Sequence, residues 1–240
     1  MRPFDFSYIL RYVCALVPFI GRTLQVTVLS VVCGTVLGAL LAWARLSRFR
    51  PARALSAVYV HVIRCTPSIV LLFIVYYGVP KLLELAVGIR AGYNGKLLYV
   101  AVTLSLLFAA SMCELFRSAY GAVDTGQKDA AFCCGFTPFQ TAVLIIIPQA
   151  AAAAVPVFCN EVIALLKQGA LAFTIGYIDL MGQTDVIIAR NYGAHGLETY
   201  IALALIYWLL SLAVGAASAA FERRTLRGKS VPGRNDSEWN

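Results

Sequence analysis

Long apolar segments, separated by short polar ones, determine what this chain can fold into. The first runs from Thr23 to about Ala44 and contains no charged residue. About 20 apolar residues in a helix are enough to cross the hydrocarbon core of a bilayer. Of the 240 residues, 60% are hydrophobic and 13% are charged, which excludes an ordinary soluble domain. We therefore expect an all-α membrane protein, because a helix satisfies its own backbone polar groups in lipid.

Four further spans are expected from hydropathy, which gives about five in all. They are expected at about Ala54–Pro80, Leu97–Tyr120, from after Pro148 to about Gln168, and at about Thr199–Phe221. The fourth could also begin ten residues earlier, because residues 139–167 are nearly all apolar. Within the second span, Pro67 removes a helix hydrogen bond, so we expect a kink or unwinding near Thr66. Residues 169–198 hold one apolar run that is too short to cross, and we expect them to fold back along the outer half.

Basic residues flank the spans in a way that predicts their orientation. One cluster follows the first span and one follows the last: Arg45, Arg48, Arg50 and Arg53, then Arg223, Arg224, Arg227 and Lys229. Cytoplasmic loops of membrane proteins are enriched in Lys and Arg, so the N-terminus is expected outside and the C-terminus in the cytoplasm. This placement accounts for the net charge of +8. We therefore expect membrane lipid, and no nucleic acid, as a partner.

The chain is expected to form one membrane domain with two short flanks. Charges at Asp5 and Arg11 interrupt residues 1–22, so this segment is interpreted as an interfacial helix and not as a signal peptide. Residues 23–224 are expected to form the transmembrane domain. Residues 225–240 are polar and are expected to be a disordered cytoplasmic tail.

Residues that carry chemistry are few. The seven cysteines do not have the CxxC pairs of a zinc site, and we interpret them as small packing residues. His61 and His195 are the two histidines, and no HExxH motif accompanies them. The chain also has no GxxxxGK[ST] loop, so any ATP must be bound and hydrolysed by another polypeptide. We expect no metal, no cofactor and no enzymatic activity in this chain.

A polar stretch interrupts the apolar segments at Gly121–Ala150. Its residues 129–131, Asp-Ala-Ala, are followed after three residues by Gly135, and after nine more by Ile145-Ile146-Ile147-Pro148. The number of preceding spans places this stretch in the cytoplasm. A polar, bent segment between membrane helices suits the docking of a soluble partner. The alternative is a plain loop whose glycine and prolines mark turns.

This stretch resembles the EAA loop of ABC-importer permeases, whose pattern is Glu-Ala-Ala, three residues, Gly, nine residues, Ile-x-Leu-Pro. Asp129 replaces the glutamate and Ile147 the leucine, while every spacing is kept. Other segments are similar to the polar amino-acid uptake branch of that family, which includes histidine, arginine and glutamine permeases. They are Arg64-Cys65-Thr66-Pro67, Glu114-Leu115-Phe116-Arg117, Leu165-Leu166-Lys167 and Phe221-Glu222-Arg223-Arg224.

The resemblance implies the membrane subunit of an ATP-binding-cassette importer in the bacterial cytoplasmic (inner) membrane. It implies three partners: a dimer of ATPase subunits, a second identical or paralogous permease, and a periplasmic or surface-tethered solute-binding protein. The family's EAA loop docks on the ATPase, so ATPase coupling is expected from Asp129, Ala130, Ala131, Gly135 and Pro148. The small alanines allow a close approach, Gly135 permits a turn between helices, and Pro148 suits the first turn of the next helix.

Glu161 is the strongest candidate for substrate binding. It lies 13 residues after Pro148, which places it about 20 Å along a helix. An isolated carboxylate at that depth costs on the order of 3 kcal/mol. We therefore expect Glu161 either to bind a positively charged group of the substrate or to pair with Arg64 or Lys167.

Three weaker candidates accompany Glu161. Asn160 begins the run Asn160–Ile163, which resembles permeases for basic amino acids and opines. Ser68 offers a hydroxyl either to a ligand or to the kink at Pro67. Glu114 could contact substrate, although pairing with Arg117 at i,i+3 is the favoured interpretation. A basic amino acid or opine is therefore the expected substrate. Substrates of the glutamine, glutamate or cystine type remain an alternative, as does a secondary transporter, although we see no inverted repeat.

Overall fold

The computed structural model describes residues 4–88 and 95–226, and these residues form helices without strands. The predicted tail at 225–240 lies almost entirely outside the described residues. The elements in order are α1 (Phe6–Leu16), η1 (Val17–Phe19), α2 (Ile20–Leu46), α3 (Arg50–Cys65), α4 (Ser68–Val87), α5 (Lys96–Ala122), α6 (Thr125–Cys133), α7 (Pro138–Gln140), η2 (Thr141–Ile146), α8 (Ile147–Gln168), η3 (Gly169–Ile175), α9 (Leu180–Arg190) and α10 (Gly196–Leu226).

Five helical stretches of the described residues are long and apolar enough to cross a membrane, which confirms an all-α membrane fold with about five spans. They are Phe6–Leu46, Ser68–Ala86, Lys96–Ala122, Pro138–Ile175 and Gly196–Ala220. The first begins earlier than predicted, because α1 continues through η1 into α2 without a loop. The interfacial position of residues 1–22 remains a prediction, as does the orientation of the termini.

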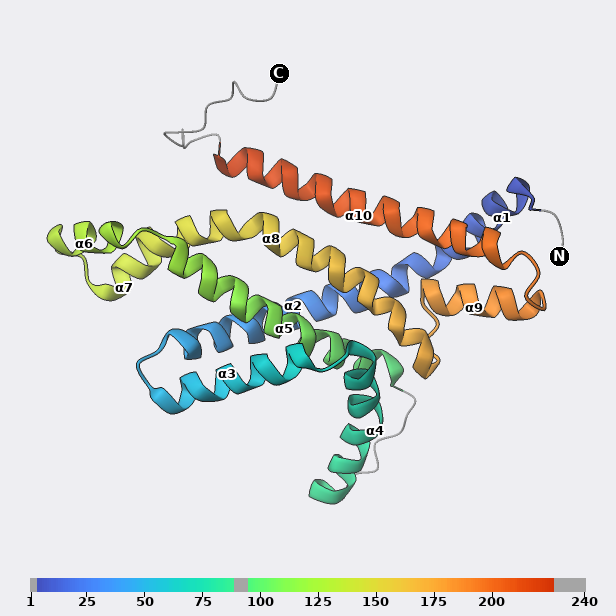
Figure 1. Cartoon of the computed structure of the whole chain (residues 1–240), viewed down its shortest axis with the longest axis horizontal. Helices are drawn as coiled ribbons and strands as arrows, with labels where there is room; N and C mark the ends of the chain where they lie inside the picture. The colour runs from blue at the N-terminus through green and yellow to red at the C-terminus, as the bar shows by residue number, and fades with distance from the viewer. Residues whose placement is uncertain (1–3, 89–94, 227–240) are drawn as a thin grey trace.

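The predicted second span is wrong in its limits, because the chain breaks in its middle. Thr66 and Pro67 are extended, with ψ of 127° and 135°, and they separate α3 from α4. This break confirms the expected unwinding near Thr66. Figure 1 shows α4 leaving the end of α3 at a steep angle. Only α4 is apolar enough to cross, since α3 carries Arg53 and Arg64 on exposed positions.

The fourth span starts at Pro138. Of the two predicted starts, after Pro148 or ten residues earlier, the earlier one is therefore confirmed. Thr137 and Gln140 form a capping box, in which the Thr137 hydroxyl accepts from the Gln140 N–H and the Gln140 side chain accepts from the Thr137 N–H. The π-helical turn η2 then leads into α8 without a loop. Pro148 lies in the first turn of α8. Next to it in the sequence, the side-chain amide of Gln149 donates a hydrogen bond to the carbonyl of Ile145 at 3.0 Å.

The main core is built around α5, which packs against α2, α4 and α8. Two glycines let α2 and α5 approach closely. A Cβ atom at Gly38 would lie 2.5 Å from Cβ of Met112, and one at Gly34 would lie 2.9 Å from Cβ of Phe108. Since a larger side chain does not fit at either position, these glycines set the distance between the two helices.

A second core joins α1, α9 and α10 through residues such as Leu16, Leu180 and Leu203. Figure 1 shows these helices at one end of the bundle, while α6 and α7 project from the opposite end. The short connection between α2 and α3 lies at the same end as α6 and α7. The two ends of the bundle are therefore built from different elements: α6, α7 and the connection between α2 and α3 at one end, and α1 and α9 at the other.

Candidate functional site

A cavity of about 180 Å³ lies beside the break between α3 and α4. Its walls come from α3, α4, α5 and α8. The lining residues are Ile63, Arg64, Thr66, Ser68, Leu107, Phe108, Ser111, Glu161, Ala164, Leu165 and Gln168. Two of the four residues predicted to bind substrate, Glu161 and Ser68, thus meet in one cavity although 93 residues separate them in the sequence.

Glu161 and Arg64 bring opposite charges to this cavity. Glu161 is half-buried on α8, and Arg64 lies in the last turn of α3. Neither side chain forms an ion pair or hydrogen bond with any residue that the structure describes. The expected alternative, in which Glu161 pairs with Arg64 or Lys167, is therefore not realised in this part of the chain. The cavity can offer both charges to a ligand.

The N-terminus of α4 supplies further polar groups. Ser68 is the first residue of α4, and the first N–H groups of a helix have no partner within the helix. The positive end of the helix dipole therefore lies next to the cavity. The Thr66 hydroxyl donates to the carbonyl of Val62 at 2.8 Å, so Thr66 satisfies the end of α3. The Ser68 hydroxyl has no such partner in the described residues and remains available to a ligand.

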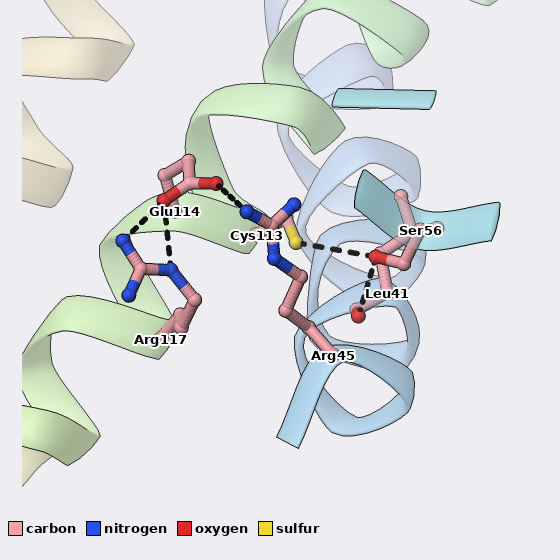
Figure 2. Close-up of polar contacts among 6 residues, drawn as sticks. All are labelled: Leu41, Arg45, Ser56, Cys113, Glu114 and Arg117. Atoms are coloured by element: carbon pink, nitrogen blue, oxygen red, sulfur yellow. Dashed lines mark hydrogen bonds and ion pairs between the residues drawn. The ribbon is translucent and has the colours of Figure 1, made fainter. Parts of the chain in front are cut away.

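The other two predicted substrate residues lie elsewhere. Asn160 is exposed on α8 and does not line the cavity. Glu114 bridges two guanidinium groups, with Oε2 2.7 Å from Nη2 of Arg117 and Oε1 3.3 Å from Nη2 of Arg45 (Figure 2). The i,i+3 pair with Arg117 confirms the favoured interpretation. The pair with Arg45, which joins α5 to α2, was not predicted.

A hydrogen-bonded contact extends this connection to α3. The Ser56 hydroxyl donates to the carbonyl of Leu41 at 2.9 Å and lies 3.8 Å from Sγ of Cys113 (Figure 2). Ser56 and Cys113 are both buried. Polar contacts therefore tie α2, α3 and α5 together shortly before α5 ends and α6 begins.

The predicted coupling segment forms two short helices joined by a turn at Gly135. Gly135 has a φ of 82°, which is a left-handed conformation that suits glycine. Its N–H donates to the carbonyl of Phe132 at 3.0 Å, and the N–H of Phe136 donates to the carbonyl of Ala131 at 3.0 Å. These two bonds form a Schellman motif that ends α6. The predicted helix-ending role of Gly135 is confirmed.

The two alanines of this segment differ from the expectation that both face a partner. Ala130 and Asp129 are exposed on α6, whereas Ala131 is only 3% exposed. Ala131 packs within the chain because α6 rests against η2. Large apolar side chains are instead exposed here, namely Phe132 on α6 and Phe139 on α7, the latter at 76%.

Sequence reasoning passed over several residues of the cavity. Gln168 lies seven residues after Glu161 on α8, so helical periodicity places both on one face. Ser111 lies three residues before Glu114, yet an uncharged serine inside an apolar helix gives little signal. Within residues 4–88 and 95–226, no group of three or more His, Cys, Asp or Glu side chains is close enough to hold a metal ion.

Comparison with known proteins gives consistent matches. Residues 34–227 match the family model described as "Binding-protein-dependent transport system inner membrane component". The L-cystine transport system permease protein of Bacillus subtilis (strain 168) is 36% identical, over 88% of this chain and 87% of the relative. The arginine transport system permease protein of the same organism is 33% identical, over 92% and 96%. A solved structure described as an amino acid ABC transporter with histidines superposes with a TM-score of 0.81, at 31% identity over 93% of this chain and 100% of that chain.

Proposed function

This chain belongs to the family of binding-protein-dependent transport system inner membrane components, and we propose that it is the permease subunit of an ATP-driven importer of polar amino acids. It is a multi-pass protein of the bacterial inner membrane and a transport component. Relatives named for cystine and arginine transport support the amino-acid substrate class. These matches span nearly the whole chain, which supports proposing the same transport role for the whole chain and not for one segment of it.

The proposed orientation places α6 and α7 in the cytoplasm. These helices lie at the same end of the bundle as the connection between α2 and α3, where Arg48, Arg50 and Arg53 are exposed. Enrichment of basic residues near one membrane face supports a cytoplasmic position for that end. The end that carries α1 and α9 is then outside.

In this orientation α6 and α7 would dock on a dimer of ATPase subunits, which would bind and hydrolyse the ATP. The exposed Phe132 supports a partner surface, because it lies on α6 outside the five apolar stretches, and Phe139 is exposed near it at the very start of the fourth stretch. Asp129 and Ala130 lie exposed beside them. A second permease subunit would complete the translocation pathway, and closing of the ATPase dimer would move α6 and α7 to switch the cavity between the two sides.

The observation that supports substrate binding in the cavity is the pair of free, opposite charges on Glu161 and Arg64. An α-amino acid carries a cationic and an anionic group, so it complements both residues at once. Arg64 and the N-terminus of α4 would hold the carboxylate of the substrate, because guanidinium groups and helix N-termini both bind anions. Glu161 would bind the cationic side chain of a basic amino acid or opine.

A substrate without a cationic side chain is the second candidate. Arg64 gives the cavity as much positive as negative charge, and this balance favours a zwitterion. Glu161 would then bind the α-ammonium group of an amino acid of the glutamine, glutamate or cystine type. The relative named for cystine transport supports this alternative.

Uptake by the complex reconstituted in liposomes, with a panel of radiolabelled amino acids and ATP supplied on the cytoplasmic side, tests both candidates. The decisive variant is Glu161→Gln, with the exposed Asp185→Asn on α9 as the matched control. Loss of arginine and lysine uptake alone supports the basic substrate, whereas equal loss for every amino acid supports a role at the α-ammonium group. Unchanged uptake would contradict substrate binding by Glu161, and uptake that needs no ATPase would contradict the ATP-driven importer.

A further inference from the structure

A large concavity lies at the end of the bundle opposite α6 and α7, between α1 and the loop that joins α9 to α10. It has a volume of about 1190 Å³ and is separate from the cavity of Glu161. Arg11, Arg190 and Tyr192 are among its lining residues. None of the expected site residues lies in it.

Two guanidinium groups in this concavity are free. Arg11 lies on α1 and Arg190 in the last turn of α9, and both are exposed. Neither forms an ion pair or hydrogen bond with the residues that the structure describes. The acidic residue of the lining, Glu198, is turned inward and is only 4% exposed. The accessible charge of the concavity is therefore positive.

Glu198 is already used within the chain. Its Oε1 lies 3.6 Å from Nδ1 of His195 and accepts a hydrogen bond from the N–H of Asp5 at 3.3 Å. The ring of His195 in turn stacks on Tyr8, with centroids 3.9 Å apart and planes inclined by 16°. These contacts hold the start of α10 against α1, so one wall of the concavity is fixed before any partner arrives.

The loop that forms the other wall contains a fully exposed tyrosine with left-handed backbone. Tyr192 is 100% exposed and has a φ of 52°, and His195 has a φ of 59°. Left-handed backbone at two non-glycine residues in one loop persists only where the surroundings impose it. The side-chain amide of Asn191 donates to the hydroxyl of Tyr12 at 3.3 Å and anchors this loop to α1.

The composition of this surface suits a protein partner. Tyrosine and arginine dominate the energetics of protein interfaces, and free rim charges speed the association of oppositely charged proteins. Lipid is a poorer candidate, because the exposed apolar side chains of this segment lie on a different side of the helix from Arg11. Phe6 and Leu10 of α1 and Val17 of η1 are exposed at helical spacing, and they lie roughly 100° to 140° around the helix axis from Arg11.

We propose that this concavity is the docking surface for an acidic patch of the soluble solute-binding protein, with Arg11, Arg190 and Tyr192 as the main contacts. The inference rests on the proposed function and on its orientation, in which this end of the bundle faces outside. The partner would deliver its amino acid at this end, while α6 and α7 engage the ATPase at the other.

The test uses the full complex in nanodiscs of zwitterionic phosphatidylcholine, with ATP hydrolysis measured against the concentration of substrate-loaded binding protein. In Arg11→Glu/Arg190→Glu the half-saturating concentration should rise about tenfold, while the maximal rate stays near that of the wild type. Raising NaCl from about 0.05 M to about 0.5 M should weaken the wild type and reduce this difference. Lys81→Glu on α4, an exposed cation outside the concavity, is the matched control and should leave the half-saturating concentration unchanged.

Tyr192→Asn provides a second variant that avoids misfolding, because the side chain makes no buried contact and Asn tolerates left-handed backbone. It should also raise the half-saturating concentration. The inference is overturned if the wild type is stimulated by the binding protein and both variants match it. A difference between wild type and variants that appears only when anionic lipid is added identifies a headgroup site and also overturns it. If the binding protein does not stimulate even the wild type, the proposed function fails together with the inference.

Discussion

Glu114 on α5 and Arg45 on α2 form an ion pair, with Oε1 3.3 Å from Nη2, at the end of the bundle from which α6 and α7 project. Arg117 shares the same carboxylate, so one acidic group holds two guanidinium groups. Figure 2 shows that the three side chains come from only two helices. Removal of the carboxylate would take the ion-pair partner from both Arg45 and Arg117, and it would break the ion pair that joins the end of α2 to α5.

Glu114→Gln is therefore expected to loosen this end of the bundle. Because Glu114 and Arg45 side chains are 21% and 24% exposed, the loss of stability should be about 1 kcal/mol. A lower unfolding midpoint of the complex, and more ATP hydrolysed per amino acid imported, would show both effects. Lys81→Gln, which removes the exposed pair of Lys81 with Glu84, serves as the control. Equal behaviour of the two variants would argue against a special role of Glu114.

The second prediction concerns the turn at Gly135. With a φ of 82°, a side chain at this position costs about 1 to 2 kcal/mol. Gly135→Arg should misplace α6 relative to α7, so the ATPase should no longer co-purify and uptake should be lost. Gly135→Asn, which tolerates left-handed backbone, should retain most of both. The matched control is Gly121→Ala, since a Cβ there meets nothing within 4 Å. Survival of the complex in Gly135→Arg would count against docking through this segment.

The third prediction concerns the contact of α2 with α5. Gly38→Ala places a Cβ where Cβ of Met112 would be 2.5 Å away, so the helices must separate. Overpacking of this kind costs about 1 to 3 kcal/mol, which should appear as a lower unfolding midpoint. Gly21→Ala, whose Cβ would meet nothing within 4 Å, should not lower it. A midpoint unaffected by Gly38→Ala would mean that α2 is not closely packed on α5.

The fourth prediction concerns Asp179, which lies between η3 and α9 outside the membrane-spanning stretches. Burial raises the pKa of its carboxyl to about 6, although the N–H of Gly182 donates to it at 2.9 Å and acts in the opposite direction. Between about pH 4 and pH 6 the folded chain binds more protons at this site than the unfolded chain. The contribution of Asp179 to stability is therefore greatest at low pH and is lost as the pH rises through 6.

Asp179→Asn should remove this dependence, because the amide oxygen can still cap α9 and carries no charge. The expected gain at pH above 7 is about 3 kcal/mol at most, and it should vanish toward pH 4. Unfolding midpoints of both proteins across this range provide the measurement. A variant that is less stable than the wild type at neutral pH would contradict the argument.

Local signals predicted several features of this fold. Pro67 is sufficient to break a helix, and the break at Thr66 was therefore predictable. Gly135 followed a motif with fixed spacing, and its turn depends only on nearby backbone groups. The i,i+3 spacing of Glu114 and Arg117 likewise requires no knowledge of the tertiary structure. Each of these features is settled within a few residues of the chain.

Features that depend on distant residues were harder to predict. Hydropathy averaged over residues 54–80 does not show that α3 has a polar side and that α4 alone is apolar enough to cross. The burial of Ala131 depends on how α6 rests against η2, which the alanine itself does not indicate. The placement of Arg64 and Glu161 in one cavity without an ion pair between them depends on the packing of α3 and α8 around α5. Such contacts come from the assembly of the helices and leave no local pattern.

The join between α7 and α8 has a mechanical consequence. From Pro138 through η2 to Gln168 the backbone remains helical, with no loop between the proposed ATPase contact at Phe139 and the carboxylate of Glu161. Phe139 and Glu161 are 22 positions apart, which corresponds to about 33 Å of helix. Pro156 lies inside α8 between these two residues, and both Pro156 and the π-helical turn η2 are points at which the helix can bend. A tilt of α7 by its partner would therefore reach Glu161 through a helix that can flex at these two points but that no loop interrupts.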